Sequence, residues 1–221
     1  MHSFFNQSTT SLKVCGITNQ DDAEQLVVEG IPALGVNFWP KSKRYVSPEQ
    51  ARTFLPALEG KILRVGVFVN ADPIAVFGLL SHGVIDVAQF HGDETPEYCS
   101  IFGSEGYPFI RALGVKNAES IANILDYKAT AILLDAHAPG VYGGTGDTFD
   151  WNLAKKVIDD NPELPILLAG GITLENAEQA TRVVRPAGLD LASGSESAPG
   201  IKDFDKIRAI QAAIQSANSS T

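Results

Sequence analysis

A cysteine and an aspartate each end a short apolar run, LKVC at 12–15 and AILLD at 131–135. A thiolate can accept a proton from a C–H group, and a protonated carboxyl can donate one. If both runs are strands of one parallel barrel, Cys15 and Asp135 lie where β/α barrels carry their reactive groups. The pair would then form a proton acceptor and a proton donor at one mouth. An inert buried cysteine and an aspartate that caps the next loop are the alternatives on these residues alone.

Two glycine-containing loops, AGGIT at 169–173 and ASGSES at 192–197, follow the last two apolar runs. Glycine lets backbone N–H groups approach an anion closely. In a β/α barrel, the loops after strands 7 and 8 are the recurrent phosphate site. The two loops therefore predict that a phosphorylated small molecule binds at this mouth, although either could be a plain tight turn.

Two further loops carry residues that suit substrate contact. FWPKSKRYV at 38–46 brings positive charge to an acidic chain, and the Arg44 guanidinium could pair with a carboxylate beside the Tyr45 ring. The loop at 136–150 is rich in glycine and directly follows Asp135, so it could close over a substrate. A solvated basic loop and a simple connection are the alternatives.

His91 in QFHGDE and Asp190 in LDLASG also lie near the ends of apolar runs. For His91 we favour a hydrogen-bonded structural role, whereas Asp190 is a candidate substrate contact. No group of His, Cys, Asp and Glu has metal-ligand spacing, and the chain contains neither a Walker A motif nor a dinucleotide-binding fingerprint. The sequence therefore predicts no metal and no cofactor.

The elements that must position these residues alternate along the chain. Apolar residues recur at helical spacing over 23–30, 51–58 and 118–125, and Ser47-Pro48 and Asp72-Pro73 are typical helix starts. Eight nearly continuous apolar runs, typical of strands covered on both faces, lie at 12–15, 33–38, 63–69, 85–90, 108–113, 131–135, 165–169 and 189–193. Eight such units without a break predict a single (β/α)8 TIM barrel, with a doubly wound open sheet as the competitor.

The composition is that of one soluble domain: 221 residues, 44% hydrophobic, 19% charged and a net charge of −9. This acidity disfavours binding to nucleic acid or to an anionic membrane. We expect residues 1–11 to be a poorly ordered leader and 12–221 to form the barrel. Without a signal peptide or an apolar segment of about 20 residues, the chain is expected to be cytoplasmic. Its oligomeric state stays open between monomer and homodimer.

Taken together, these segments resemble the phosphoribosylanthranilate isomerase family of tryptophan biosynthesis. The matching segments are KVCGIT, ALGVNFWPKSKRYVSPEQA, VGVFVN, AQFHGDE, LLDA with GGTGDTFDW, LAGGIT and GLDLASGSESAPGIKD. They run from about residue 13 to 203, and their order and spacing are specific even though each segment alone is weak.

The resemblance implies a (β/α)8 barrel that catalyses an Amadori rearrangement without a metal or organic cofactor. N-(5′-phosphoribosyl)anthranilate would become 1-(2-carboxyphenylamino)-1-deoxyribulose 5-phosphate. By matching position, Asp135 is similar to the family's general acid, Cys15 to its general base and Arg44 to the group that meets the anthranilate carboxylate. The residues similar to the family's phosphate cradle are Gly170, Gly171, Ser193 and Gly194.

This sequence departs from the family pattern at a few positions. Phe90 stands where leucine is usual, Ala192 replaces a common serine, and Asn37-Phe38-Trp39 is bulkier than usual. An indole-glycerol-phosphate synthase is the nearest enzyme rival, but it would require a lysine acid and paired glutamates at strand ends. A non-catalytic sensor of a phosphorylated metabolite is a rival of another class, which an assay of turnover would separate from the isomerase.

Overall fold

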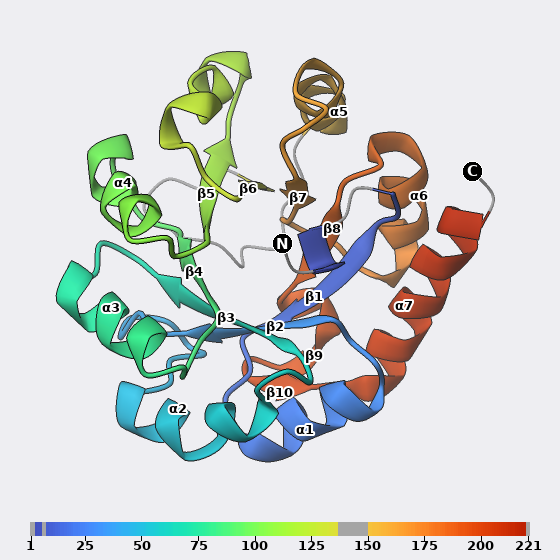
Figure 1. Cartoon of the computed structure of the whole chain (residues 1–221). Coiled ribbons are helices and arrows are strands. Elements are labelled where there is room, and N and C mark those ends of the chain that lie inside the picture. Colours follow the sequence, from blue (N-terminus) through green and yellow to red (C-terminus); the bar gives the residue numbers. More distant parts are fainter. Residues whose placement is uncertain (1–2, 6–7, 137–149, 220–221) are drawn as a thin grey trace.

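In the computed structural model, which describes residues 3–5, 8–136 and 150–219, eight parallel strands close into one barrel. Each strand pairs with its neighbours in chain order, and β1 pairs with both β2 and β8. Helices surround this barrel as a ring (Figure 1). The strands are β1 Ser11–Cys15, β2 Ala33–Asn37, β3 Leu63–Phe68, β4 Val87–Phe90, β5 Phe109–Val115, β6 Ala131–Ala136, β7 Ile166–Leu168 and β8 Gly188–Leu191. The predicted TIM barrel is confirmed, and the open sheet is excluded.

Two helices begin where the sequence predicts, at Ser47-Pro48 and at Asp72-Pro73. Asn19, Ser47 and Asp72 each cap a helix with a side-chain oxygen that accepts a backbone N–H. The Gln50 N–H donates to the Ser47 hydroxyl at 3.2 Å, and the Gln50 side-chain amide donates to Thr18 O at 3.0 Å. The α-helices are α1 Gln20–Val28, α2 Pro48–Phe54, α3 Pro73–Ser81, α4 Pro96–Ser104, α5 Trp151–Asp160, α6 Leu174–Val184 and α7 Phe204–Ser219.

The stretch 118–125 does not form the predicted amphipathic α-helix. It forms two 3₁₀ turns, η3 Ala118–Ile121 and η4 Ile124–Tyr127, in which Ile121 and Ile124 are buried. Leu125, placed by the prediction on the apolar stripe, is 61% exposed. The i, i+3 spacing of Ile121 and Ile124 matches three residues per turn, so the tighter helix buries both isoleucines.

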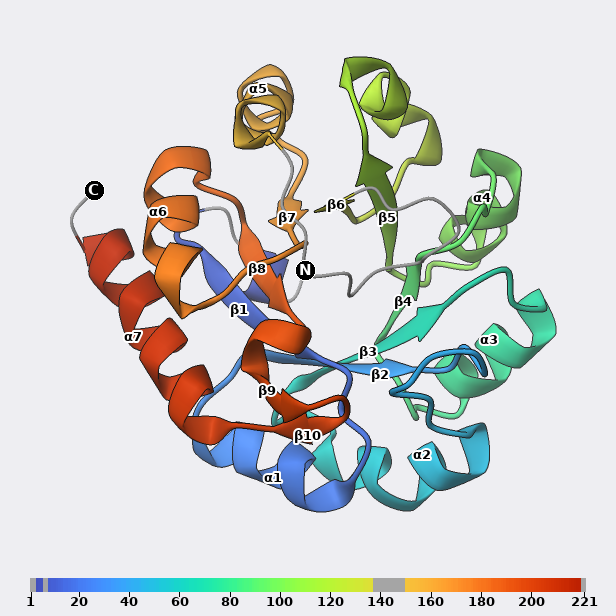
Figure 2. The same cartoon turned by 180° about the vertical axis from the view of Figure 1, so that it is seen from behind.

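The polypeptide after β8 returns to the carboxyl end of β1, where Lys202 Nζ donates to Cys15 O. It forms η5 Ser193–Ser195 and a small antiparallel pair, β9 Glu196–Ala198 and β10 Ile201–Lys202. In Figure 2 this pair lies next to α1, below β1. It therefore brings two charged side chains, Glu196 and Lys202, next to the end of β1.

Two apolar layers hold the barrel. One lies between strands and helices, and the other fills the barrel interior, where Phe4 and Phe5 are 1% and 3% exposed. These rings come from a short 3₁₀ helix, η1 Ser3–Phe5, so two aromatic side chains close one end of the interior. Phe90 packs against Phe102, so this departure from the family pattern changes the outer layer and not the mouth.

Of residues 1–11, which the sequence predicts to be a poorly ordered leader, the structure describes 3–5 and 8–11. Besides the buried Phe4 and Phe5, Thr10 exchanges two hydrogen bonds of 3.0 Å with the side-chain amide of Asn218 in α7. The Thr10 hydroxyl also donates to Pro186 O at 2.8 Å. The partners of Thr10 lie near the far end of the chain, beyond the reach of local sequence patterns.

Candidate active site

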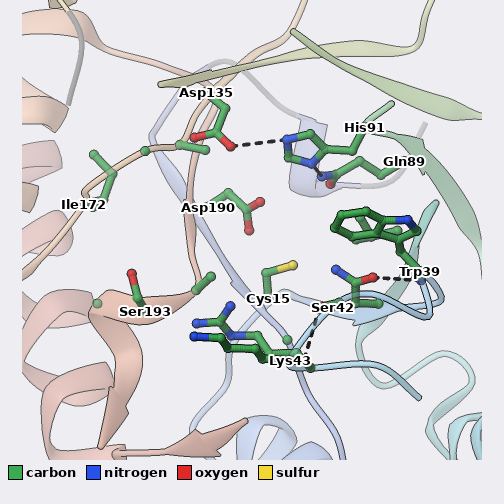
Figure 3. A pocket seen from close by; sticks show the side chains of 18 of the residues that line it. Cys15, Trp39, Ser42, Lys43, Gln89, His91, Asp135, Ile172, Asp190 and Ser193 are labelled. Carbon is green, nitrogen blue, oxygen red and sulfur yellow. Dashed lines mark hydrogen bonds and ion pairs between the residues drawn. The ribbon is translucent and has the colours of Figure 1, made fainter. Parts of the chain in front are cut away.

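Cys15 and Asp135 line the same pocket, at the carboxyl ends of β1 and β6. In Figure 3 the thiol and the carboxyl point into this pocket from different strands. The predicted positions of Arg44, Gly170, Gly171, Asp190, Ser193 and Gly194 all line it as well. The fold therefore brings these eight residues together at one pocket.

The Cys15 thiol sits against β2, where Gly35 is its register partner. A Cβ atom at Gly35 would lie 2.7 Å from Cys15 Sγ, so only glycine leaves room for the sulfur. Burial raises the pKa of the Cys15 thiol, Lys13 and Lys202 oppose that rise, and Asp190 adds to it. The thiol is therefore harder to ionise than that of a solvent-exposed cysteine.

Asp135 is 5% exposed, and its two oxygens have different partners. Oδ1 accepts a hydrogen bond from the Ala136 N–H at 2.8 Å, and Oδ2 lies 3.2 Å from His91 Nε2. A Cβ atom at Gly170 would lie 2.9 Å from Oδ1 and 2.6 Å from Ala136 N. Gly170 also has a φ of +79°, so both its conformation and its neighbours require glycine.

His91 is the functional neighbour that the sequence reasoning assigned to structure. Its Nδ1 lies 3.1 Å from Gln89 Nε2, which leaves Nε2 facing Asp135 (Figure 3). Among the described residues Gln89 Oε1 is buried without a hydrogen-bond partner. Gln89 lies in the predicted strand 85–90 and His91 directly follows it, so their spacing of two residues was the available signal that they share a face.

Arg44 reaches the pocket, but it is not the free fork that the sequence suggested. Its Nε and Nη2 donate to the two carboxylate oxygens of Glu196 at 2.8 and 2.6 Å. This bidentate pair leaves Nη1 as the guanidinium nitrogen available to a ligand. A Cβ atom at Gly16 would lie 2.3 Å from Arg44 Cδ, so Gly16 makes room for the arginine side chain.

Glu196 is the centre of a buried ionic cluster that the sequence reasoning missed. Lys202 Nζ donates to Glu196 Oε1 at 2.9 Å and to Cys15 O at 2.6 Å. Burial raises the pKa of Glu196, but hydrogen bonds and charge from Arg44 and Lys202 outweigh it and hold that pKa below the usual value. The cluster ties the strand end that carries Cys15 to the segment after β8.

The aromatic wall of the pocket is Trp39, and not Tyr45 as predicted. Figure 3 shows the Trp39 indole opposite Asp190, whereas Tyr45 is 38% exposed and does not line the pocket. Lys43 lines the same side. The bulky FW pair in the sequence was the signal for this wall, but spacing alone does not tell which ring turns inward.

The two glycine loops pack directly on each other. A Cβ atom at Gly194 would lie 2.0 Å from Ile172 O, so the loop after β8 needs glycine to contact the loop after β7. Gly170 and Gly171, both with positive φ, line the pocket beside Ser193 and Gly194. Their side of the pocket lies across from Trp39 (Figure 3).

The predicted lid, 136–150, falls almost wholly on 137–149, outside the described residues. Within the described part of the chain, no three His, Cys, Asp or Glu residues cluster as metal ligands would. The same part contains no helix of the length and apolarity that crossing a membrane requires.

Comparison with known proteins identifies the same family that the sequence segments resemble. Residues 12–213 match the N-(5′-phosphoribosyl)anthranilate (PRA) isomerase family. The N-(5′-phosphoribosyl)anthranilate isomerase of Azotobacter vinelandii is 42% identical over 207 residues, which cover 93% of this chain and 97% of that protein.

Two solved structures are also similar over 94% of this chain and 100% of their own chains. One, with a TM-score of 0.81 and 36% identity, shows mutually generated monomers of the dimeric enzyme from Thermotoga maritima. The other, with a TM-score of 0.80 and 36% identity, is a phosphoribosylanthranilate isomerase in complex with reduced 1-(o-carboxyphenylamino)-1-deoxyribulose 5-phosphate.

Proposed function

This chain belongs to the phosphoribosylanthranilate isomerase family and catalyses that isomerisation in tryptophan biosynthesis, and we propose that Asp135 and Cys15 are its general acid and general base. The observation that carries the proposal is the convergence of these two groups on one pocket from strands far apart in sequence. An acid and a base held in one pocket can each act on a different atom of a small sugar without moving.

Asp135 acts first. It gives its proton to the furanose ring oxygen, the C1′–O bond breaks, and the electron pair on the anthranilate nitrogen forms an iminium. His91 Nε2, 3.2 Å from Asp135 Oδ2, holds the carboxyl toward the pocket. Enclosure of Asp135 limits its contact with bulk water, which favours donation to the substrate.

Cys15 acts second, as the thiolate. It removes the proton from C2′, and the C–H electrons form the C1′–C2′ double bond while the iminium nitrogen regains its pair. The resulting enolamine tautomerises to the ketone, and proton exchange returns both side chains to their starting states. The reaction is a rearrangement within one molecule, so its atoms and electrons balance without a second substrate.

The two ends of the substrate fix its direction across the pocket. We assign the phosphate to the backbone N–H groups at Gly170, Gly171, Ser193 and Gly194, and the anthranilate ring to Trp39 on the opposite side (Figure 3). Arg44 Nη1 then meets the anthranilate carboxylate. This orientation places C1′ and C2′ between the Asp135 carboxyl and the Cys15 thiol.

We further propose that the enzyme is cytoplasmic and that its partner is the phosphorylated small-molecule substrate, with no nucleic acid or membrane partner. A homodimer is the assembly to test first, because the similar enzyme of Thermotoga maritima is dimeric. Sedimentation at micromolar concentration would distinguish a dimer from a monomer.

The roles of Asp135 and Cys15 are tested by loss of substrate fluorescence with freshly generated phosphoribosylanthranilate. Asp135→Asn and Cys15→Ser should each lower kcat by about 10²- to 10⁴-fold, the usual contribution of a positioned acid or base. The matched controls are Asp159→Asn, on the exposed side of α5, and Cys99→Ala, in the outer core. Turnover at the rate of the unchanged enzyme in Asp135→Asn or Cys15→Ser would remove that residue's role.

A further inference from the structure

Lys13 is a fully buried cation that the proposed mechanism does not use. It is 0% exposed, and its Nζ donates to both oxygens of Asp190 at 2.8 and 2.9 Å. Its strand position explains the pairing, because Lys13 in β1 is the register partner of Asp190 in β8. Lys13 is not among the residues that line the pocket, so it does not contact the substrate.

Lys13 lies directly behind Cys15. The two residues are two positions apart in β1, so both side chains point to the same face of the strand. A Cβ atom at Gly35 would lie 3.1 Å from Lys13 Nζ and 2.7 Å from Cys15 Sγ, so both atoms flank one point on β2. The absence of a side chain at Gly35 lets the ammonium and the sulfur occupy neighbouring positions.

A buried ion pair is a costly way to fill a barrel. Removing two charges from water carries a large penalty, and well-packed apolar side chains of similar volume are often as stable or more stable. The pair therefore has no clear advantage for folding alone. Because the Lys13–Asp190 pair lies next to the sulfur that must become negative, its charges act on the ionisation of Cys15.

The charges around Cys15 come from four segments. Lys13 belongs to β1, Asp190 to β8, Lys202 to β10, and Arg44 to the loop after β2. Lys202 and Arg44 are both held by Glu196, whose carboxylate neutralises part of their charge. Lys13 is the cation among these whose side chain follows the same strand face as the sulfur.

We propose that Lys13 is a positioning residue whose fixed positive charge stabilises the Cys15 thiolate, with Asp190 as the counter-ion that holds Lys13 in place and limits its effect. The inference rests on Cys15 being the general base. In the ionisation step the Cys15 S–H bond breaks, its electron pair stays on sulfur, and the proton passes to water before the substrate fills the pocket.

The charge states support this arrangement. Burial lowers the pKa of Lys13, but Asp190 and the Cys15 sulfur outweigh it, so that pKa is raised and Lys13 stays an ammonium. Burial dominates the raised pKa of Cys15, Lys13 is the largest opposing influence, and Asp190 acts in the other direction. Lys13 and Asp190 therefore have effects of opposite sign on the same sulfur.

The opposite signs give a test that does not depend on turnover. The rate of Cys15 alkylation by iodoacetamide is measured against pH, with the modified residue located by peptide mass spectrometry. Cys99 is an internal control because it is buried, and burial raises the pKa of its thiol to about 12. Thermal unfolding of each variant shows whether the barrel is intact.

Lys13→Met should move the alkylation profile of Cys15 to higher pH by at least about one unit, a tenfold loss of thiolate at neutral pH. Asp190→Asn should move the profile to lower pH. The double variant Lys13→Met/Asp190→Asn removes both charges, retains the side-chain volumes and should lie between the unchanged enzyme and Lys13→Met. Lys13→Met should also lower kcat at neutral pH with little change in KM.

An alkylation profile that Lys13→Met leaves unchanged would overturn the proposal, as would shifts of the same sign in the two single variants. If Lys13→Met fails to fold, the double variant is compared with Asp190→Asn, and an identical profile in these two would overturn the proposal. Failure of the proposed function has a different signature, since Cys15→Ser would then retain turnover while the alkylation profiles still shifted in opposite directions.

Discussion

Glu196→Gln probes how the enzyme holds Arg44 ready for a carboxylate. Glu196 binds Arg44 through two short hydrogen bonds and binds the buried Lys202 through a third. The substitution keeps the shape but removes the charge, so two cations face each other with a neutral amide between them. The change has two opposing effects on KM. Loosening of Arg44 raises KM, whereas release of its guanidinium from Glu196 lowers KM.

The free energies of these contacts favour the first effect, in which a loosened Arg44 raises KM. Breaking a buried ion pair by removing one partner costs about 3–5 kcal/mol of folding stability, and the retained amide places this variant near the lower limit. With roughly 2–4 °C lost per kcal/mol in a domain of this size, Tm should fall by roughly 6–12 °C. A hydrogen bond to a charged group contributes about 1.5–3 kcal/mol, so partial loss of the Arg44 contact should raise KM roughly tenfold.

The assay combines thermal unfolding with steady-state kinetics over a range of substrate concentrations. Glu178→Gln is the matched control, because Glu178 pairs with Arg182 on the exposed face of α6 and such a pair contributes at most about 1 kcal/mol. A KM that falls in Glu196→Gln would show that Glu196 competes with the substrate for Arg44. An unchanged KM with a lower Tm would limit Glu196 to a structural role.

Three further predictions concern Arg44, Phe4 and the acid stability set by Glu196. Arg44→Ala should raise KM with a smaller effect on kcat, and an unchanged KM would remove its carboxylate contact. Phe4→Ala should lower the free energy of unfolding by about 3–5 kcal/mol in urea melts, because the ring fills the barrel interior; a loss below about 1 kcal/mol would contradict this. Since the pKa of Glu196 lies below the usual 4.5, its stabilisation is full above that pH and is lost as pH falls through the native value. Stability should therefore fall less steeply below pH 4.5 in Glu196→Gln than in the unchanged enzyme.

The sequence predicts the barrel and the placement of its reactive ends because these depend on local patterns. Each strand reads as an apolar run, and Cys15 and Asp135 end two of them. The helix starts at Ser47 and Asp72 are likewise set by side chains a few residues away. The failure over 118–125 is also local, since isoleucines three residues apart suit a 3₁₀ turn as well as an α-helix.

Other features depend on partners that meet only in the folded chain. Arg44 and Glu196 are 152 residues apart, and Lys13 and Asp190 are 177 residues apart. No spacing rule predicts such pairs, so local patterns predicted a free guanidinium for Arg44 and assigned no role to Lys13. The contact of Thr10 with Asn218 and the burial of Phe4 in the barrel interior also depend on residues far along the chain.

The most direct test of the central claim is the kinetic isotope effect of substrate deuterated at C2′, measured in single turnovers with enzyme in excess. If Cys15 removes the C2′ proton, Cys15→Ser slows that step alone and the isotope effect should increase. If Asp135 opens the ring before it, Asp135→Asn should make ring opening limiting and the isotope effect should disappear. The same change in both variants would contradict the assignment of acid and base to separate steps.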